Sequence, residues 1–591
     1  MVLSISEIGE LMAGIYGIFS KDELNTSNIY NYFYSSTLDN IINEEYKYNN
    51  FLYGRSVVNK FLDDRVLYED NSIIIGFEGV FYNKKDEKSV ETIKDLYYND
   101  NFNFAAKIKG QFCGFIFDKR LDKLYIYNDH LSTKPLYVYK NKDIFIFASE
   151  LKVVTGLLSQ LKIKKELDYD AIYSMLTFGY MLDDITYEKN TKKLKYARIL
   201  TVDNSLEIEE NQYFKFKKKE DNTISKEEII NKIDDLLISS IKDCWNKDKE
   251  YNYKHYSFLS GGLDSRVNVF LAKELGYNDI LTMTFSQSGS SDDKIAQEIS
   301  SKENFEHLFY SLDNGKFLEK NLEKYILAND GLNNLSGSAS GYKFLSTLNH
   351  NNYGALHTGQ IGDVLFGSFI KNNYKIESGM ITNQFELIKK ISFIEKIKNK
   401  YNNNPEIYSY EQRQPNSTLN GDITASHFTD MLSPFYNRDL IEFCLTIPDK
   451  YKKDEKIYLD WFNSKHKNIS NYIWEGAGIK PNNINYVKIA KIIKRYKNGI
   501  LRRLGFNIND MNPFDVWLRT NKDILENLDL EYSNNIDKIK DKELKNILIS
   551  MYNSKVKYSH YGRNNKFLVI TLLLALNLHF GEENETIFIK N

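Results

Sequence analysis

The residues best suited to chemistry form one short run, Ser260-Gly261-Gly262-Leu263-Asp264-Ser265. An apolar run precedes it, and apolar residues recur after it at the spacing of one helix face, which predicts a turn between a strand and a helix. Two glycines let the backbone curl close to an anion, while backbone N–H groups, serine hydroxyls and the helix N-terminus attract negative charge. We interpret the turn as a phosphate cradle in which Asp264 is placed to bind Mg²⁺. The alternative is a tight strand–helix connection with Asp264 as a first-turn charge.

A second aspartate follows another predicted strand end. Residues 355–369 read ALHTGQIGDVLFGSF, in which Thr358 and Gly359 precede Asp363. Because Mg²⁺ binds several oxygen atoms and usually bridges phosphates, one carboxylate holds it poorly. Asp264 and Asp363 are therefore predicted to supply one carboxylate each. The alternative for Asp363 is a helix cap.

These residues need a scaffold, and the chain changes character once along its length. Over residues 1–216, β-type runs alternate with turn residues, which predicts a sheet-rich domain. The polar segment Lys217–Ser225 is a predicted linker. Over residues 226–591, long helical patterns alternate with short strands, which predicts an α/β domain with a parallel sheet. In such a sheet, ligands bind beyond the carboxyl ends of the strands, where the glycine-rich run falls.

Composition narrows the class of protein. The chain has 591 residues, more than one ordinary core holds, and its formal net charge of −2 gives no general attraction to nucleic acid. Its three cysteines match no metal-ligand spacing and favour a reducing, cytoplasmic location. Glu7 and Glu10 stand where a signal peptide is basic, so none is expected. The apolar run Phe567–Leu578 is too short to span a bilayer, so we predict a buried helix and no transmembrane segment.

The second part of the chain resembles the synthetase domain of class B asparagine synthetases and of their β-lactam synthetase and lasso-peptide cyclase relatives. Ser260–Ser265 matches their pyrophosphate loop, Thr358–Asp363 is similar to their SGEGSD stretch, and Ser433–Asn437 resembles the start of their VPFLD…IP segment. The resemblance implies an ATP-pyrophosphatase-type domain that uses ATP and Mg²⁺, with Asp264 and Asp363 on the metal. It assigns the nucleotide contacts to Leu259, Ser260, Gly261, Gly262, Leu263, Asp264, Ser265, Phe285, Thr358 and Gly359.

The first part is similar to the class II glutaminase domain of the same family. The matching strings include Ala13–Phe19, Gly79–Asn83, Lys109–Phe112 and Asp129–Tyr137. The resemblance implies a sandwich of two antiparallel sheets flanked by helices.

Several glutamine-handling positions differ from that family. A class II glutaminase attacks with an N-terminal cysteine, but Ala13 stands at the matching place, and a methyl group cannot attack an amide. Glu78 replaces the oxyanion-hole asparagine, and Val80 replaces the glutamate that holds the substrate amine. We therefore predict that this domain is inactive towards glutamine. The alternative is a relocated nucleophile such as Cys113, which would need its own base and oxyanion donors.

The acceptor side of the synthetase domain has changed as well. Gln360 stands where asparagine synthetases have a glutamate and β-lactam synthetases a tyrosine base, and an amide accepts no proton usefully. Asp430 is predicted to orient or deprotonate an attacking amine, with a surface aspartate as the alternative. Lys480 is matched loosely to the family lysine that stabilises the adenylate, with a solvated lysine as the alternative.

Together these parts predict ATP-dependent amide-bond formation through an acyl-adenylate, without glutamine hydrolysis. The retained but cysteine-free glutaminase fold is most similar to lasso-peptide cyclases, in which a side-chain carboxylate of a short precursor peptide is joined to the peptide's own N-terminal amine. The partners implied are that peptide and a leader protease. The alternatives are β-lactam synthetase-like or asparagine synthetase-like amidation of a small acid or sugar, and a non-catalytic scaffold in a biosynthetic complex.

Residues 487–504 carry a further pattern. Isoleucines and a tyrosine recur at helical spacing, and seven lysines and arginines surround them. We predict an amphipathic surface helix whose apolar stripe docks on the core. The alternative is a docking site for an acidic peptide, a partner protein or the inner membrane surface.

Overall fold

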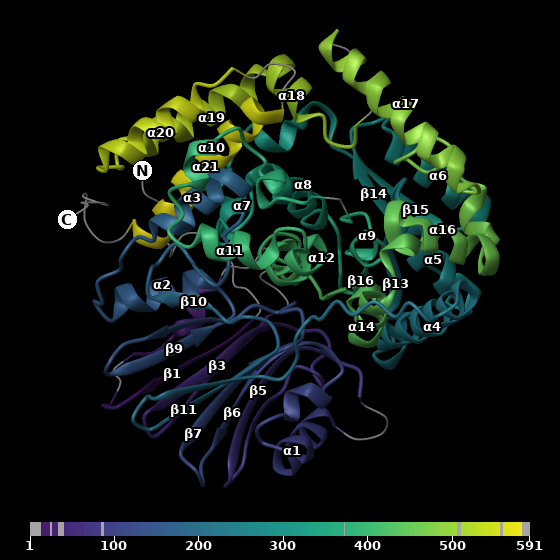
Figure 1. Cartoon of the computed structure of the whole chain (residues 1–591). Coiled ribbons are helices and arrows are strands. Elements are labelled where there is room, and N and C mark those ends of the chain that lie inside the picture. The colour runs from purple at the N-terminus through teal and green to yellow at the C-terminus, as the bar shows by residue number, and fades with distance from the viewer. Residues whose placement is uncertain are drawn as a thin grey trace.

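Two antiparallel sheets packed face to face form the first part of the chain (Figure 1). The structure is a computed structural model that describes residues 14–23, 26–33, 41–83, 88–370, 373–504, 510–555 and 560–581, without the side chains of residues 502, 503, 560 and 561. Among these residues each sheet has six strands, in the orders β10-β8-β9-β1-β3-β2 and β12-β11-β7-β6-β5-β4. The strands are β1 (Gly14–Ser20), β2 (Ile41–Tyr48), β3 (Phe51–Val58), β4 (Leu67–Glu69), β5 (Ile73–Phe81), β6 (Gly110–Asp118), β7 (Lys123–Asn128), β8 (Tyr137–Lys140), β9 (Ile144–Ala148), β10 (Thr191–Lys193), β11 (Arg198–Asp203) and β12 (Ile208–Gln212).

Aromatic side chains from both sheets fill the space between them. Phe51 of β3 and Phe117 of β6 stack with ring centroids 5.1 Å apart, and Phe19 of β1 meets Phe117 edge-on at 5.5 Å. Helix α1 (Ser89–Asn99) covers the outer face of one sheet, and α2 (Leu151–Gln160) and α3 (Tyr169–Phe178) lie on the side of the other. The predicted two-sheet sandwich flanked by helices is confirmed.

A parallel sheet with helices around it forms the second part. Its strand order is β15-β14-β13-β16-β17, and every neighbouring pair is parallel. The strands are β13 (Lys254–Phe258), β14 (Leu281–Ser286), β15 (Glu306–Ser311), β16 (Tyr353–His357) and β17 (Met431–Leu432). The predicted α/β domain with a parallel sheet is therefore confirmed.

Helices make up most of the rest of this part. The α-helices are α4 (Lys226–Glu250), α5 (Asp264–Glu274), α6 (Ser291–Glu303), α7 (Glu323–Leu327), α8 (Leu335–Leu345), α9 (Gly362–Leu365), α10 (Phe385–Ile388), α11 (Ile394–Tyr401), α12 (Pro405–Tyr408), α13 (Asn420–Ser426), α14 (Arg438–Thr446), α15 (Asp449–Lys452), α16 (Lys456–Lys465), α17 (Ile484–Arg503), α18 (Phe514–Thr520), α19 (Lys522–Ile536), α20 (Lys542–Tyr552) and α21 (His560–Phe580). A π-helical segment, Ser409–Thr418, joins α12 to α13. Helix α21 contains the apolar run Phe567–Leu578 and is largely buried, as predicted.

The transition between the two parts is sharp. The last strand of the sandwich ends at Gln212, and α4 begins at Lys226. Ser225 caps α4, because its hydroxyl accepts a hydrogen bond from the backbone N–H of Glu228 at 3.2 Å and the Glu228 carboxylate accepts one from the backbone N–H of Ser225 at 2.8 Å. The domain limits 1–216 and 226–591 stay predictions.

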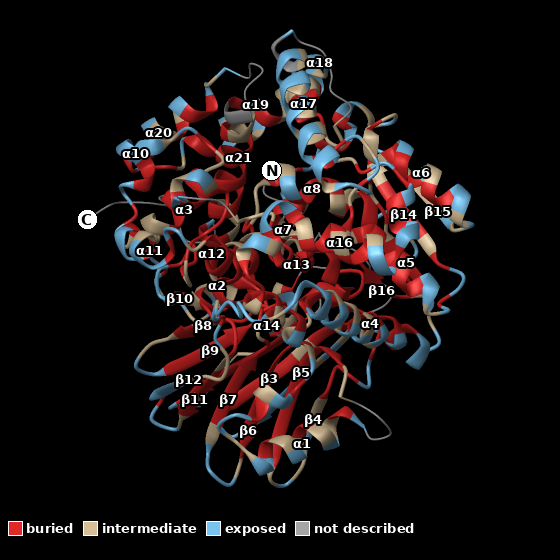
Figure 2. Ribbon diagram, turned by 45° about the vertical axis from the view of Figure 1, so that its right-hand side comes forward, coloured by how far each residue is buried: buried red, intermediate tan, exposed pale blue. Residues whose placement is uncertain are grey.

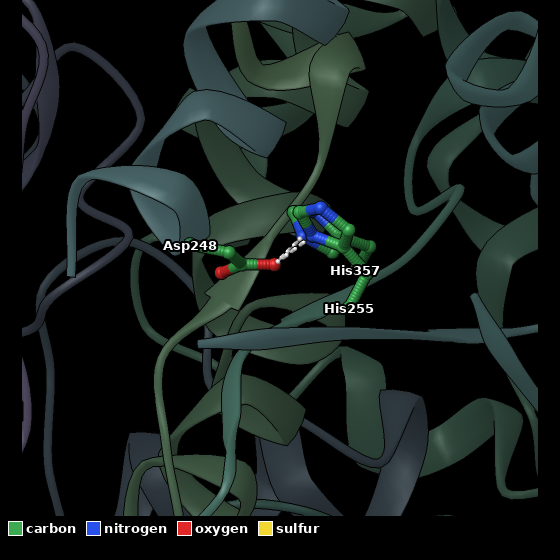
Figure 3. A group of neighbouring side chains, drawn as sticks. All are labelled: Asp248, His255 and His357. Carbon is green, nitrogen blue, oxygen red and sulfur yellow. Dashed lines mark hydrogen bonds and ion pairs between the residues drawn. The ribbon is translucent and has the colours of Figure 1, made fainter. Parts of the chain in front are cut away.

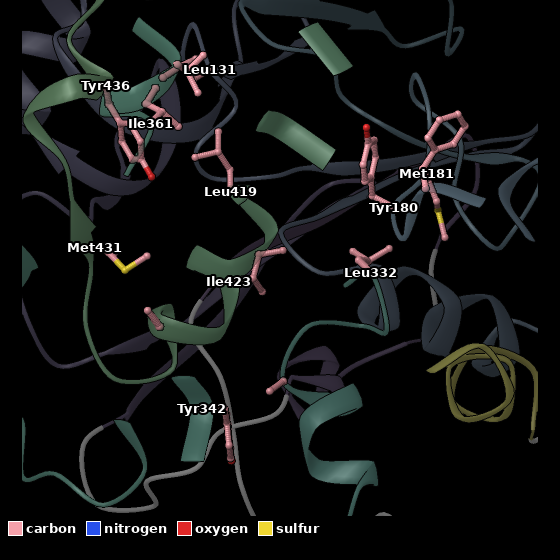
Figure 4. Packing of buried hydrophobic residues seen from close by; sticks show 14 of the residues in the cluster. Leu131, Tyr180, Met181, Leu332, Tyr342, Ile361, Leu419, Ile423, Met431 and Tyr436 are labelled. Carbon is pink, nitrogen blue, oxygen red and sulfur yellow. The ribbon is translucent and has the colours of Figure 1, made fainter. Parts of the chain in front are cut away.

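One hydrophobic core joins the two parts. Leu131 and Met181 from the first part lie in the same buried cluster as Leu419, Ile423 and Tyr436 from the second (Figure 4). Figure 2 shows buried residues continuing from the sheets into the helices above them. In the described part of the chain, no helix is long and apolar enough to cross a membrane.

Candidate functional site

The glycine-rich loop forms a tight turn between β13 and α5. The Ser265 hydroxyl accepts a hydrogen bond from the backbone N–H of Ser260 at 3.1 Å, and the Ser260 hydroxyl accepts one from Gly262 at 3.1 Å. Helix α5 begins at Asp264, so its N-terminal peptide groups face the turn. This is the predicted strand–turn–helix context, in which the helix dipole favours an anion.

The second loop, residues 358–363, lies directly against the first. A Cβ atom on Gly359 would lie 2.3 Å from the carbonyl carbon of Asp264, and one on Gly362 would lie 2.5 Å from the carboxyl carbon of the same aspartate. These positions therefore accept only glycine. Between them Ile361 has φ 60°, a left-handed conformation that β-branched residues rarely adopt. Such strain is typical of functional turns.

Asp264 and Asp363 come together in these loops. Oδ2 of Asp264 accepts a hydrogen bond from the backbone N–H of Asp363 at 3.0 Å, and Oδ2 of Asp363 accepts one from the Ser368 hydroxyl at 3.0 Å. Desolvation raises the pKa of Asp264 well above its usual value, and the carboxylates of Asp363 and Glu455 raise it further. A divalent cation relieves this crowding of like charges, so the donor set suits Mg²⁺.

The predicted contacts for the base and the ribose lie at the carboxyl ends of neighbouring parallel strands. The ring of Phe285, on β14, stacks on Phe344 with centroids 5.1 Å apart and meets Phe258 edge-on at 5.5 Å. Leu259 follows β13 and is buried. Thr358 follows β16, and its backbone N–H donates to β17 at 2.9 Å. The structure brings these residues together, while their contact with a nucleotide stays a prediction.

A lysine other than the predicted one contacts a neighbour of the glycine-rich loop. Lys480 is exposed to solvent. Lys494 of α17 instead contacts the Glu475 carboxylate at 2.6 Å, and the backbone N–H of Glu475 donates to the Gly261 carbonyl at 2.9 Å. Sequence reasoning missed Lys494 because it counted this residue in the basic face of an amphipathic helix.

The surroundings of Asp430 argue against its predicted role as a base. The side chain is buried where the two parts of the chain meet, and it bonds to Arg65 at 2.8 Å through one oxygen and to Lys134 through the other. Burial alone raises a carboxyl pKa, but these two cations bring the pKa of Asp430 down to about 2. A carboxylate this acidic, with both oxygens engaged, is a poor proton acceptor.

Asp422, which the sequence analysis did not select, has a raised carboxyl pKa, unlike Asp430. Burial raises its pKa to about 7, against hydrogen bonds from Tyr436 and Gln360 that lower it. The Tyr436 hydroxyl lies 2.9 Å from Oδ2 of Asp422 and also bonds to the Gln360 side chain, whereas Oδ1 has no hydrogen-bond partner among the described residues. The sequence offers no signal for this group, because the residues that perturb it are distant along the chain.

Gln360 opens onto a large chamber. The cavity measures about 690 Å³, and aromatic rings, polar groups and the N-terminal turn of α8 surround it. Arg413 also lines it, lies 4.6 Å from the ring centroid of Phe369, and forms no ion pair with any described residue. A half-buried guanidinium that pairs with no carboxylate in the described part of the chain favours an anionic ligand.

The cavity beside Glu78 is small. Glu78, Lys134, Ser149 and Asp422 surround a space of about 20 Å³, which holds about one water molecule. Ala13 lies outside the described residues. The thiol of Cys113 is fully buried, and desolvation raises its pKa, which disfavours the nucleophilic thiolate.

Asp248, His255 and His357 form a buried cluster beneath the second loop (Figure 3). Nδ1 of His255 and Nε2 of His357 each lie 2.8 Å from Oδ2 of Asp248, and Trp245 stacks on His357 at 4.0 Å. Two histidines and a carboxylate are a ligand set that metals accept. Here both rings share one oxygen at hydrogen-bond distance, so we assign the cluster a positioning role. It ties the strand end before Thr358 to α4.

Helix α17 does not dock its apolar stripe on the core, so that expectation is wrong. Lys491 and Lys494 face inward and pair with Glu455 and Glu475. Ile493, in contrast, is 61% exposed. The acidic groups beside the glycine-rich loop attract the lysines, and this turns the apolar face outward.

Two sequence families match the chain. Residues 67–214 match the family described as glutamine amidotransferase domain, and residues 232–416 match asparagine synthase. A protein named asparagine synthetase (glutamine-hydrolyzing) 2 of Methanocaldococcus jannaschii is 25% identical over 53% of this chain and 64% of its own length. Asparagine synthetase (glutamine-hydrolyzing) 1 of Bacillus subtilis is 26% identical over 39% of this chain and 38% of its own length.

These matches identify the chain as a member of the asparagine synthetase-like family. The chain spans less than two thirds of the length of either relative. Among solved structures, the glutamine phosphoribosylpyrophosphate amidotransferase of B. subtilis matches 52% of this chain and 61% of its own, at 9% identity and a TM-score of 0.20. A TM-score of this size does not establish a shared fold.

Proposed function

We propose that this protein forms amide bonds with ATP through an acyl-adenylate, without hydrolysing glutamine, and that its substrate is a short peptide that it closes into a macrolactam. The observation that carries the proposal is the pair of loops around Asp264 and Asp363. They combine a phosphate cradle at a helix N-terminus with two adjacent carboxylates at the carboxyl edge of a parallel sheet.

In the first step, a substrate carboxylate oxygen attacks the α-phosphorus of ATP, and the bond to the β-phosphate breaks to release pyrophosphate. The glycine-rich loop holds the phosphates at the N-terminus of α5. Asp264 and Asp363 are the residues that would hold Mg²⁺, which would supply charge neutralisation for the leaving pyrophosphate. Lys494 is the lysine placed to add positive charge near the phosphates, because it contacts Glu475, and Glu475 is hydrogen-bonded to Gly261.

In the second step, the substrate amine attacks the acyl carbon, AMP leaves, and the amine loses a proton. Asp422 is the group we assign to this proton, acting through the Tyr436 hydroxyl, which Gln360 orients by a hydrogen bond at the edge of the chamber. Its pKa of about 7 suits proton transfer near neutral pH, because an acceptor with a pKa near the working pH is the most effective.

The size of the chamber supports a peptide substrate. A cavity of about 690 Å³ lies in the range of sites for drug-sized ligands, about 300–1,000 Å³, and exceeds what a single aspartate needs. Arg413 offers a contact for a second anionic group of the substrate, such as another carboxylate. Amidation of a small acid or sugar remains the alternative reaction.

Three observations support the absence of glutamine hydrolysis. Ala13 cannot act as a nucleophile. The cavity beside Glu78 has room for about one water molecule. Glu78 itself pairs with Arg65 at 3.4 Å, and Val80 is fully buried in the core. Neither residue is thus placed to bind glutamine.

The proposal is tested with purified protein, ATP, Mg²⁺ and candidate peptides that carry an internal Asp or Glu. We expect AMP and pyrophosphate, a peptide lighter by one water, and no glutamate when glutamine is added. Release of glutamate would show an active glutaminase. Failure to form AMP with any candidate peptide or small acid would favour the non-catalytic scaffold.

Replacing Asp422 with asparagine separates the two steps. We expect Asp422→Asn to lower amide formation by about 100-fold, because general acid–base catalysis contributes about 10²–10⁴-fold. Pyrophosphate–ATP exchange should stay near the wild-type rate, because adenylation requires no base. Asp422→Glu is expected to restore part of the product. An equal loss of exchange and product in Asp422→Asn would assign the residue to structure instead.

A further inference from the structure

Helix α17 presents an inverted amphipathic face. Lys491 pairs with Glu455, Lys494 pairs with Glu475, and Val487 is buried, so one side of the helix is attached to the body of the protein. Figure 1 shows the helix at the outer edge of the molecule. The residues that usually dock a helix on a core therefore lie on its free side.

The free side is a continuous apolar stripe. Its residues recur at intervals of three and four, as one helical face requires. They are all more than half exposed: Tyr486, Ile489, Ile492, Ile493, Tyr496 and Ile500. Single exposed apolar residues are common, but a stripe of this kind marks an interaction site.

The charge around the apolar stripe indicates which kind of surface it binds. Residues 484–504 contain seven lysines and arginines and no aspartate or glutamate. Arg495 and Lys497 form no ion pair with another described residue, and Lys488 pairs with Asp454 at an exposed position. The surface therefore combines apolar side chains with uncompensated positive charge.

We propose that α17 binds the anionic surface of a lipid bilayer, with its axis in the plane of the headgroups and its isoleucines inserted among them. Basic amphipathic helices of about this length lie in such interfaces because acyl chains accept the apolar face and lipid phosphates attract the flanking cations. The helix is about 30 Å long, so the whole stripe can contact one flat surface.

A second copy of the chain fits this surface less well. A twofold dimer brings the same patch from both subunits together, so α17 would face α17. The uncompensated charges of Arg495 and Lys497 would then oppose the same charges of the second copy beside an apolar contact, which is unfavourable. An anionic bilayer meets the same helix with opposite charge.

The test is sedimentation of the full-length protein with vesicles. We expect binding to vesicles of phosphatidylcholine with phosphatidylglycerol, weak binding to phosphatidylcholine alone, and weaker binding as salt increases. The variant Ile489→Gln with Ile493→Gln should bind at least about tenfold more weakly, because it removes the inserted apolar groups. Arg495→Gln with Lys497→Gln should lower binding by about tenfold through charge alone.

A matched control removes exposed apolar groups elsewhere. Phe102 and Leu530 are 60% and 57% exposed, and Phe102→Gln with Leu530→Gln should bind vesicles like the wild type. Equal loss in this control, or no preference for anionic vesicles, overturns the proposal. A dimer detected by light scattering that the isoleucine variant abolishes, together with no vesicle binding, assigns the stripe to a protein contact. AMP formation, measured on the same variants, should be unchanged, so this result is independent of the proposed reaction.

Discussion

Replacing Asp264 with asparagine is expected to lower AMP formation by about 100-fold or more and to make the Mg²⁺-free protein more stable. The loss of rate follows because one of two carboxylates facing the phosphates is removed, and single groups that stabilise developing charge contribute about 10²–10³-fold. The gain in stability follows because Asp264 is desolvated beside Asp363 and Glu455, which raise its pKa. A neutral side chain removes that repulsion.

The rate is measured as pyrophosphate–ATP exchange at saturating Mg²⁺, and stability as the midpoint of thermal unfolding with EDTA. Lys494→Gln in the same assay should lower exchange by about tenfold, since it removes one cation near the glycine-rich loop. Lys480→Gln is the matched control and should exchange at the wild-type rate, because that lysine is exposed to solvent. A less stable Asp264→Asn variant with normal exchange contradicts the predicted metal site.

The second large effect is expected at Asp430, where Asp430→Asn should destabilise the protein by about 3 kcal/mol. Removing one partner of a buried ion pair leaves uncompensated charge, which typically costs about 3–5 kcal/mol. Arg65 would remain buried and Lys134 largely buried, both without their closest carboxylate, while Glu78 and Asp64 balance Arg65 only in part. Urea unfolding measures the change. A base at this position would instead give a stable protein that forms no amide.

Asp537→Asn is the control, because the Asp537 side chain is 86% exposed where it pairs with Lys545, and its replacement should leave the unfolding midpoint unchanged. Protonation of Asp430 at low pH should destabilise the protein as the Asp430→Asn substitution does. The folded-state pKa of Asp430 is about 2, below the ordinary value of 3.8, so its contribution is present above about pH 4 and is lost as the pH falls towards 2. The variant should therefore lose less stability than the wild type over that interval.

Much of the fold was predictable because local patterns carry it. The alternating runs of the first part became β5, β6, β7 and β9, and the change to helical spacing after Ser225 coincided with the start of α4. Apolar alternation and helix capping each involve only a few consecutive residues, so both patterns are visible in the amino-acid sequence.

The loops of the candidate site were predictable for a related reason. Ser260–Ser265 and Thr358–Asp363 each follow a strand of one parallel sheet, and the carboxyl ends of such strands share an edge. Glycines at 359 and 362 then permit the close contact with Asp264. Residue type and position favoured pairing the two aspartates, and the resemblance to the synthetase domain implied the same pair.

The acceptor residues were not predictable in the same way. Asp430 and Asp422 are both aspartates in the same region, but one meets Arg65 and Lys134 while the other is buried beside Tyr436. The pKa of a carboxyl group depends on charges and burial within a few ångströms. Arg65 lies in the sandwich, far from Asp430 in the sequence, so no local pattern predicts that the two residues meet.

Helix α17 shows the same division. The helical spacing of its apolar residues and its positive charge were evident in the sequence, and the helix lies where this pattern predicted it. Which face turns inward was decided by Glu455 and Glu475, which only the folded chain places opposite Lys491 and Lys494. The sequence by itself determined the elements and the glycine-rich turns after the strands, because these depend on short-range spacing. The tertiary structure alone decided which carboxyl is acidic, which lysine pairs with the neighbour of the loop and which face of α17 is free, because Coulomb interactions and burial act between residues that are distant in sequence.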